Sequence, residues 1–262
     1  MNLTVPPLVA RAANSEVRKV TSVRTNWLIG GGVVVAGVLA FVALGAGFQP
    51  GGAHGQGFSS GSGWAALLTL WVLVLTVAAA AVFGALGSAT EFHTGSLAIS
   101  TLYTSDRTLL LGSKLAVAGG FSLATVVAME ILGGAAMRLT GGSRVPMDGG
   151  FFGVLIGVAL AAVCWAVIGT ALGFALRSPT RVLAAVLGWA VLEPLLWITL
   201  RAIGFGGLAA ILPVSSTVGA ISGGRYAKSA LIAPTPAAMV LMVLWSAAAG
   251  AGAWWLFTRR DL

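Results

Sequence analysis

The sequence predicts an all-α, polytopic membrane protein with six transmembrane helices. Hydrophobic residues make up 58% of the 262 residues and charged residues only 8%, whereas a soluble domain carries about 25% charged residues. The apolar residues fall in long runs, each near the ~20 residues that a spanning helix needs. The 37 glycines suit close contact between helices in lipid. No separate soluble domain fits beside six spans, so residues 1–262 are expected to form one transmembrane domain.

The apolar runs define the expected spans, which cover 27–48, 64–89, 113–137, 150–176, 182–203 and 234–257. Residues 1–26 are polar and basic. We expect them to form an amphipathic helix in the membrane interface. In that helix Val9, Val17, Val20 and Val23 face lipid, and Arg11, Arg18, Lys19 and Arg24 face headgroups. A cleavable signal peptide is the alternative, but its charged region is normally short, and here 26 residues precede the apolar run.

The distribution of basic residues predicts that both ends of the chain are cytoplasmic. With the N-terminus inside, ten basic residues fall on the inner side: Arg11, Arg18, Lys19, Arg24, Arg107, Lys114, Arg177, Arg181, Arg259 and Arg260. Five fall on the outer side: Arg138, Arg144, Arg201, Arg225 and Lys228. The basic residues lie mostly between apolar runs, so the net charge of +8 indicates topology and anionic membrane lipids rather than nucleic acid as a partner.

The polar stretch 91–112 interrupts the apolar sequence on the predicted inner side. Read as a helix, it is amphipathic, with Phe92, Ile99, Leu102 and Tyr103 on one face. Two interpretations of this periodicity stay open. The helix either presents a face to a cytoplasmic partner or lies among the lipid headgroups.

The same stretch carries a resemblance to a known family. Glu91, then Gly95-Ser96-Leu97, then Arg107 and Gly112 with Lys114 resemble the intracellular signature of type 2 ABC transporter permeases. The segment Ser15 to Val20, with Arg24 and Trp27 after it, is similar to the family's elbow helix. The ending Arg259-Arg260-Asp261 is similar to its usual C-terminus.

The resemblance implies a function and partners. The chain would be the permease subunit of a bacterial ABC exporter in the cell membrane, moving a hydrophobic or amphipathic substrate. It would pair with a second permease subunit and with a cytoplasmic ATPase that binds ATP and Mg²⁺, leaving no cofactor in this chain. The helix after Glu91 would be the coupling helix. The residues implied to couple to the ATPase are Glu91, Gly95, Ser96, Leu97, Leu102 and Arg107.

The resemblance also implies a substrate path lined by the second and fifth spans, with Trp71, Glu193 and Trp197 as candidates. The segment 204–233 would form a re-entrant outer gate, and its glycines and Pro213 divide it into short pieces. Glu193 alone is ambiguous: an ionisable residue inside a span is a candidate functional site, but it can also hold helices together. For Glu130 we expect a structural pairing with Arg138, eight residues on.

The motifs that are missing from the sequence limit the other function classes. The sequence contains no G-x-x-x-x-G-K-[ST] loop, so we expect no ATP site in this chain and no catalytic activity of its own. It contains no H-E-x-x-H pair and no G-x-S-x-G elbow. His54 and His93 fall on opposite sides of the membrane and cannot share a metal. Two alternatives to the exporter stay open: an intramembrane lipid-modifying enzyme, and an ion-coupled secondary transporter using Glu193.

Overall fold

The computed structural model describes residues 7–47, 63–103, 106–142, 145, 147–222 and 232–259. The side chains of 7, 63–70, 98, 99, 102 and 103 lie outside this description. Within the described residues the fold is all-helical. Six of the helices are long and apolar enough to cross a membrane, which confirms the predicted number of spans. They are α2 (Arg24–Ala46), α3 (Gly63–Thr94), α5 (Arg107–Gly141), α6 (Gly149–Leu176), α7 (Pro179–Ala202) and α10 (Thr235–Arg259).

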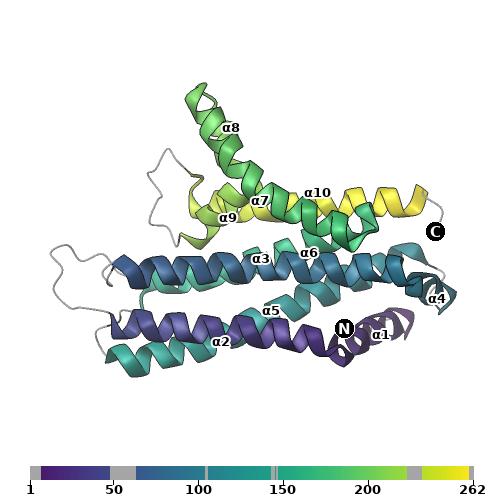
Figure 1. Cartoon of the computed structure of the whole chain (residues 1–262), viewed down its shortest axis with the longest axis horizontal. Helices are drawn as coiled ribbons and strands as arrows, with labels where there is room; N and C mark the ends of the chain where they lie inside the picture. Colours follow the sequence, from purple (N-terminus) through teal and green to yellow (C-terminus); the bar gives the residue numbers. More distant parts are fainter. Residues whose placement is uncertain are drawn as a thin grey trace, which may run out of the picture.

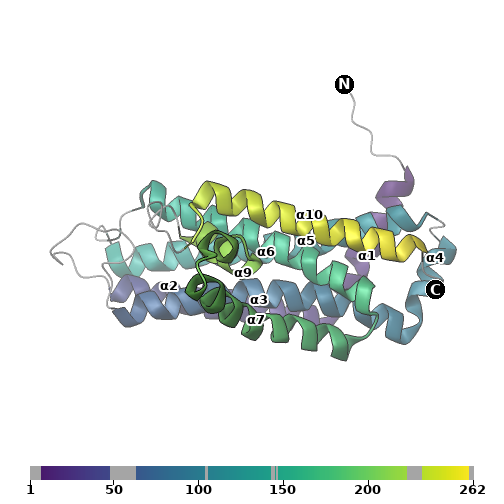
Figure 2. The same cartoon turned by 90° about the horizontal axis from the view of Figure 1, so that it is seen from above.

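Four shorter helices accompany these spans: α1 (Pro7–Ser22), α4 (Ser96–Tyr103), α8 (Gly206–Ala210) and α9 (Pro213–Ile221). Helices α1 and α4 lie at one end of the bundle, together with the last turns of α10 (Figures 1 and 2). We call this the α4 end. Helix α9 packs against α6 and α10 farther along the bundle, toward the opposite end.

Several helix boundaries differ from the sequence-based expectation at the α4 end. Residues 91–94 belong to the last turn of α3, and 107–112 open α5, so only Ser96–Tyr103 forms a separate helix within the expected 91–112. Gly95 breaks the chain between α3 and α4 with a φ of 70°, a conformation that glycine adopts without strain. Asp106 begins α5, because its side chain accepts hydrogen bonds from the backbone N–H groups of Thr108 and Leu109.

Close packing of α3 against α6 forms the centre of the bundle. Three glycines make this approach possible, since a Cβ built on Gly84, Gly169 or Gly173 would lie 2.0 to 2.8 Å from a backbone oxygen of the facing helix. Gly169 and Gly173 stand four residues apart on α6, a spacing that lets helices approach closely in membranes. The built Cβ of Gly157, also on α6, meets Ala220 of α9.

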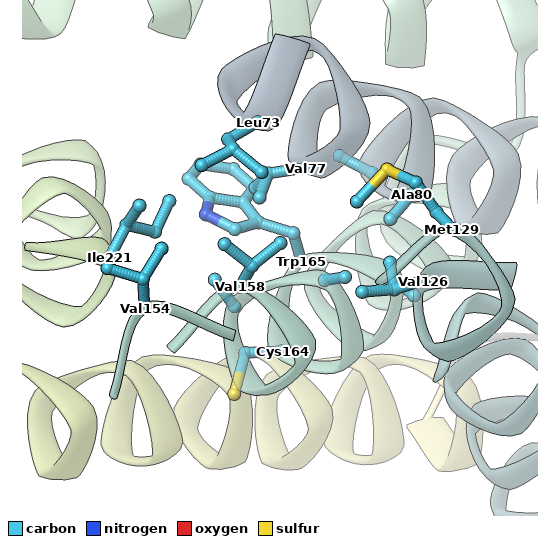
Figure 3. Packing of buried hydrophobic residues seen from close by; sticks show 14 of the residues in the cluster. Leu73, Val77, Ala80, Val126, Met129, Val154, Val158, Cys164, Trp165 and Ile221 are labelled. Carbon is cyan, nitrogen blue, oxygen red and sulfur yellow. The ribbon is translucent and has the colours of Figure 1, made fainter. Parts of the chain in front are cut away.

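The core beside this contact is built around Trp165 of α6. Figure 3 shows its ring among side chains of α3, α6 and α9, including Leu73, Val158 and Ile221. Its indole N–H donates to Thr217 Oγ1 at 2.8 Å, which satisfies a polar group that is otherwise buried. Cys164 is free and buried.

Helix α7 packs lightly on the rest of the bundle. Only 17% of an 18-residue apolar stretch of α7 is buried, whereas 56% of the corresponding stretch of α3 is buried. Its exposed apolar side chains include Leu187, Val191, Leu195 and Ile198. The segment from α7 into α8 rises away from the other spans (Figure 1). This helix therefore presents a long apolar face to lipid or to another chain.

Candidate functional site

Four charged side chains form a closed ring at the α4 end of the bundle. Lys19 Nζ lies 2.7 Å from Glu16 Oε1 and 3.3 Å from Glu91 Oε1. Lys114 Nζ lies 2.7 Å from Glu16 Oε2 and 2.6 Å from Glu91 Oε1. Each lysine thus contacts both glutamates, and each glutamate contacts both lysines. We call these four residues the ion ring.

The ion ring joins helices that are far apart in the sequence. Glu16 and Lys19 stand three residues apart on α1, so they share a face of that helix. Glu91 comes from the last turn of α3, and Lys114 comes from the second turn of α5. Lys19 also donates to Ser100 Oγ of α4 at 2.9 Å. Four helices therefore meet at one set of charges.

Burial makes the pairing within the ring necessary. The side chains of Glu16 and Lys114 are 5% and 6% exposed, and a buried charge is tolerated only when it is paired and hydrogen-bonded. The ring holds two positive and two negative groups, so its formal charges cancel. Breaking one pair would leave a charge that is neither solvated nor compensated.

Lys19 is the most exposed member of the ring and does not face the lipid headgroups as the sequence analysis expected. It turns toward α3 and α4 because the two carboxylates and Ser100 offer it three acceptors. Burial by itself lowers the pKa of Lys19. The hydrogen bond to Glu16 and the negative charges of Glu91 and Glu16 outweigh that effect, so the pKa is raised from its ordinary value.

A cavity of about 550 Å³ opens beside the ring, between α1, α2, α3 and α5. All four ring residues line it, and its other walls are mostly apolar. Glu91 Oε2 is buried and has no hydrogen-bond partner among the described residues. Within the part of the chain that the structure describes, no group of histidine, cysteine, aspartate or glutamate side chains is arranged to hold a metal ion.

Of the remaining residues implied in ATPase coupling, Leu97 packs α4 against the bundle. Leu97 is 2% exposed and packs in a cluster with Leu110, Leu111 and Phe174. Arg107 donates to the carbonyl of Phe257, which ties the start of α5 to the last turns of α10. Gly95 makes the turn into α4, and Ser96 is its first residue. Leu102 lies in α4, but its side chain is among those not described.

The candidate substrate-path residues lie in different surroundings. Trp71 on α3 is 64% exposed, and the Trp197 ring on α7 is covered by the Arg201 guanidinium at 5.0 Å. Glu193 is 1% exposed. It accepts a hydrogen bond from the Trp189 indole N–H and another, at 2.9 Å, from the backbone N–H of Ser215.

The partner of Glu193 is the first turn of α9, whose backbone N–H groups have no acceptor within the helix. A carboxylate at this position satisfies those donors and interacts favourably with the helix dipole. Glu193 therefore anchors α9 to α7 in this structure, which supports the structural interpretation of this residue. Its role in a substrate path stays a prediction.

The expected pairing of Glu130 with Arg138 is wrong. Arg138 instead donates to the backbone carbonyls of Gly142 at 2.6 Å and Val145 at 3.4 Å, where the chain leaves α5. Glu130 Oε1 is buried without a hydrogen-bond partner among the described residues. The carbonyls at the end of the helix are closer acceptors for Arg138 than a carboxylate two turns back.

Three ring residues, Lys19, Glu91 and Lys114, were named from the sequence, but not as members of one site, and Glu16 was included only within the segment from Ser15 to Val20. Glu16 and Lys19 belong to the elbow resemblance, and Glu91 and Lys114 to the intracellular signature. Residues 72 and 98 positions apart are joined in the ring, and one sequence carries no signal for such a distant pairing. A scan for charges of opposite sign at the predicted membrane boundary would have selected these residues without pairing them.

Comparisons of the chain with protein-family models, with curated proteins and with solved structures found no match.

Proposed function

We propose that this chain is the membrane-spanning subunit of an ATP-driven exporter in a bacterial cell membrane. The ATPase is a separate cytoplasmic protein that docks at the α4 end, and α1 and α4 act as the elbow helix and the coupling helix. A second permease subunit completes the transporter. The substrate is hydrophobic or amphipathic and moves by alternating access between the two halves.

The observation that carries this proposal is the ion ring. A docked ATPase can move the spans only if the helix that it contacts is mechanically connected to them. Through Lys19, Ser100 of α4 is held to a ring that includes Glu91 of α3 and Lys114 of α5. Leu97 adds an apolar contact from α4 to the core. Displacement of α4 is therefore expected to displace α3 and α5 with it.

The charge distribution supports a cytoplasmic position for the α4 end. Among the described residues, nine basic side chains belong to this end and two, Arg138 and Arg201, to the opposite one. The nine are Arg11, Arg18, Lys19, Arg24, Arg107, Lys114, Arg177, Arg181 and Arg259. Segments rich in lysine and arginine stay on the cytoplasmic side during insertion. Both termini would then be cytoplasmic.

The exposed face of α7 supports the second subunit. Helix α7 is in contact with α3, and its outward side chains Val191, Leu195 and Ile198 are each at least 58% exposed. Trp71 on α3 is also exposed. A second subunit packed against α3 and α7 would enclose a path between the two halves.

No specific observation favours either alternative function. The ion-coupled transporter depends on Glu193, whose carboxylate is engaged by Trp189 and the start of α9. The lipid-modifying enzyme needs a nucleophile and a base, and the ion ring holds its four charged groups in mutual pairs. The exporter is therefore the function that the site supports best.

The test begins with co-purification of the tagged chain from its own membranes. We expect an ATPase without spans of its own to co-purify. The variant Trp71→Cys then places a cysteine on α3. Chemical labelling of this cysteine should differ between the nucleotide-free and the ATP-trapped complex. Cys164 is buried and gives little background labelling.

The variants Glu91→Ala and Gly95→Pro test the mechanical connection in this complex. In both, the ATPase should still bind and hydrolyse ATP, while the nucleotide-dependent change in labelling of Trp71→Cys disappears. Glu130→Ala removes a glutamate outside the ring and should keep the change. Failure of any ATPase to co-purify would overturn the proposal. An unaltered response in Glu91→Ala would overturn the role of the ring.

A further inference from the structure

Glu130 is the only charged residue in a long stretch of α5. From Leu115 to Met137 the sequence contains no other acidic, basic or histidine residue. This stretch exceeds the ~20 residues that cross a hydrocarbon core. Glu130 stands eleven residues before the end of α5 at Gly141, which corresponds to about 16 Å along the helix. Its carboxyl group therefore lies in the apolar part of the span.

The surface of α5 around Glu130 packs against apolar neighbours. Gly134, one turn later on the same face, is close to α6, since a Cβ built on it would lie 4.0 Å from the Phe151 ring. Val126, one turn earlier, belongs to the apolar core. Glu130 itself is 9% exposed, and its Oε1 is buried without a hydrogen-bond partner among the described residues. The carboxyl group is therefore removed from water.

The helices that pack against α5 bring no countercharge to Glu130 within the described residues. They are α1, α2, α3, α4, α6 and α10. The titratable residues of α1, α2, α3, α4 and α10 all lie at the α4 end, as do those in the first turns of α5 itself. Arg138 is engaged by carbonyls where the chain leaves α5, and Asp148 caps the start of α6. Cys164 of α6 points toward α10 (Figure 3).

These surroundings select the form in which the carboxyl group can be held. An ionised carboxylate that is buried without a partner is so costly that the group becomes neutral instead. A metal ion does not fit, because the described residues contain no group of side chains that could hold one. Oε1 is buried too completely for a larger molecule to reach it. A proton needs no further ligand, because it forms an O–H bond with the carboxyl group itself.

We propose that Glu130 is a proton-binding site within the membrane and is held as a carboxylic acid at neutral pH. The carboxylate takes one proton from water, an O–H bond forms, and the negative charge of the side chain disappears. This inference goes beyond the proposed transport function and does not depend on it. The site lies outside the ion ring and outside the connection from α4 to α3 and α5, so the loss of Glu130 should leave that connection intact.

Infrared difference spectroscopy of the purified chain at neutral pH tests the protonation of Glu130. A carboxylic acid has a C=O stretching band that an ionised carboxylate lacks. We expect this band in the wild-type chain, and Glu130→Gln should remove it. Glu193→Gln is the matched control, because it alters the other glutamate that lies inside a span and should keep the band. A wild-type spectrum without the band, or a band that persists in Glu130→Gln, would overturn the proposal.

The dependence of stability on pH provides the second test. The folded chain holds a proton that a water-exposed glutamate in the unfolded chain has lost at neutral pH. The folded state therefore binds more protons, and this contribution to stability is lost as the pH rises. Relative to Glu130→Gln, the unfolding equilibrium constant of the wild-type chain should rise by about tenfold for each pH unit between about 5 and 7.

Denaturant unfolding of both proteins in detergent measures this difference, and it also verifies that Glu130→Gln folds. A ratio of the two unfolding constants that does not change with pH would mean that Glu130 takes up no proton on folding, and the proposal would be wrong. No ATPase enters either measurement, so the result is independent of the proposed function.

Discussion

The two ends of the bundle each attach a short helix to the spans, but they use different interactions. At the α4 end, α4 is attached through the ion ring, in which two lysines and two glutamates neutralise one another. Toward the opposite end, α9 is attached to α7 through Glu193, which accepts from backbone and indole N–H groups and contacts no cation among the described residues.

The positions of these attachments relative to the membrane explain the difference. The ring lies where α1 meets the ends of α3 and α5, and Lys19 there retains a side-chain exposure of 38%. Full charges are tolerated at this depth because headgroups and water are near. Glu193 is 1% exposed and lies inside a span, where a charged partner would itself have to be desolvated. Oriented backbone donors at the start of α9 avoid that cost.

Removing the buried lysine of the ring should have the largest effect on stability. Lys114→Met leaves two buried carboxylates with one cation, and the free energy of unfolding should fall by about 3–5 kcal/mol. Lys19→Met removes the more exposed lysine, and we expect a loss of about 1 kcal/mol or less for that partly solvated group. Denaturant unfolding in detergent measures both. Equal losses for the two variants would show that burial does not set the strength of the ring.

Removing the carboxylate of Glu193 should have the next largest effect. In Glu193→Leu the backbone N–H of Ser215 and the Trp189 indole N–H lose their acceptor, which costs about 1–3 kcal/mol for each buried group left unpaired. Hydrogen exchange of residues 213–221 should accelerate in this variant and change less in Glu193→Gln, which retains one carbonyl oxygen. Exchange that is unchanged in Glu193→Leu would mean that α9 is held by its other contacts.

The smallest expected effect is on the alkaline limit of stability. The raised pKa of Lys19 means that the folded state favours its charged form. This contribution is fully present below the pKa of Lys19 in the unfolded chain, near 10.5, and is lost as the pH rises through the higher pKa of the folded chain. Lys19→Arg keeps its charge over this range.

Thermal unfolding in detergent at increasing pH compares these two proteins. The wild-type chain should lose slightly more stability than Lys19→Arg above the ordinary lysine pKa. Parallel curves for the two proteins would contradict a role for the charge of Lys19, and the ring would then depend on Lys114 alone.

The spans were predictable because each leaves a local trace in the sequence. A run of about 20 apolar residues has no stable place except the membrane, and α6 begins and ends within one residue of its expected bounds. The ends of α3 and α5 were less predictable. Helical hydrogen bonding continues past the last apolar residue, so Glu91 ends a span instead of opening a separate helix.

Of the four residues in the ion ring, only Glu91 was expected from the sequence to be a site residue. Lys114 is part of the permease signature, and Glu16 and Lys19 fall within the segment that resembles the elbow helix. Their pairing depends on how α1 folds back against α5, which no local pattern encodes. The failed pairing of Glu130 with Arg138 has the same origin, since two turns of spacing place the residues near one another but do not fix which acceptor the arginine takes.

The sequence by itself determined that the chain has six helices long and apolar enough to span a membrane, and roughly where they lie, because hydropathy acts locally. Only the tertiary structure decided that α1, α3, α4 and α5 meet at one ring of charges, and that Glu193 anchors α9. Both outcomes depend on contacts between helices that are distant in the sequence. In that packing, the lysines of the ring and the Glu193 carboxylate take the acceptors or donors that the folded neighbours present to them.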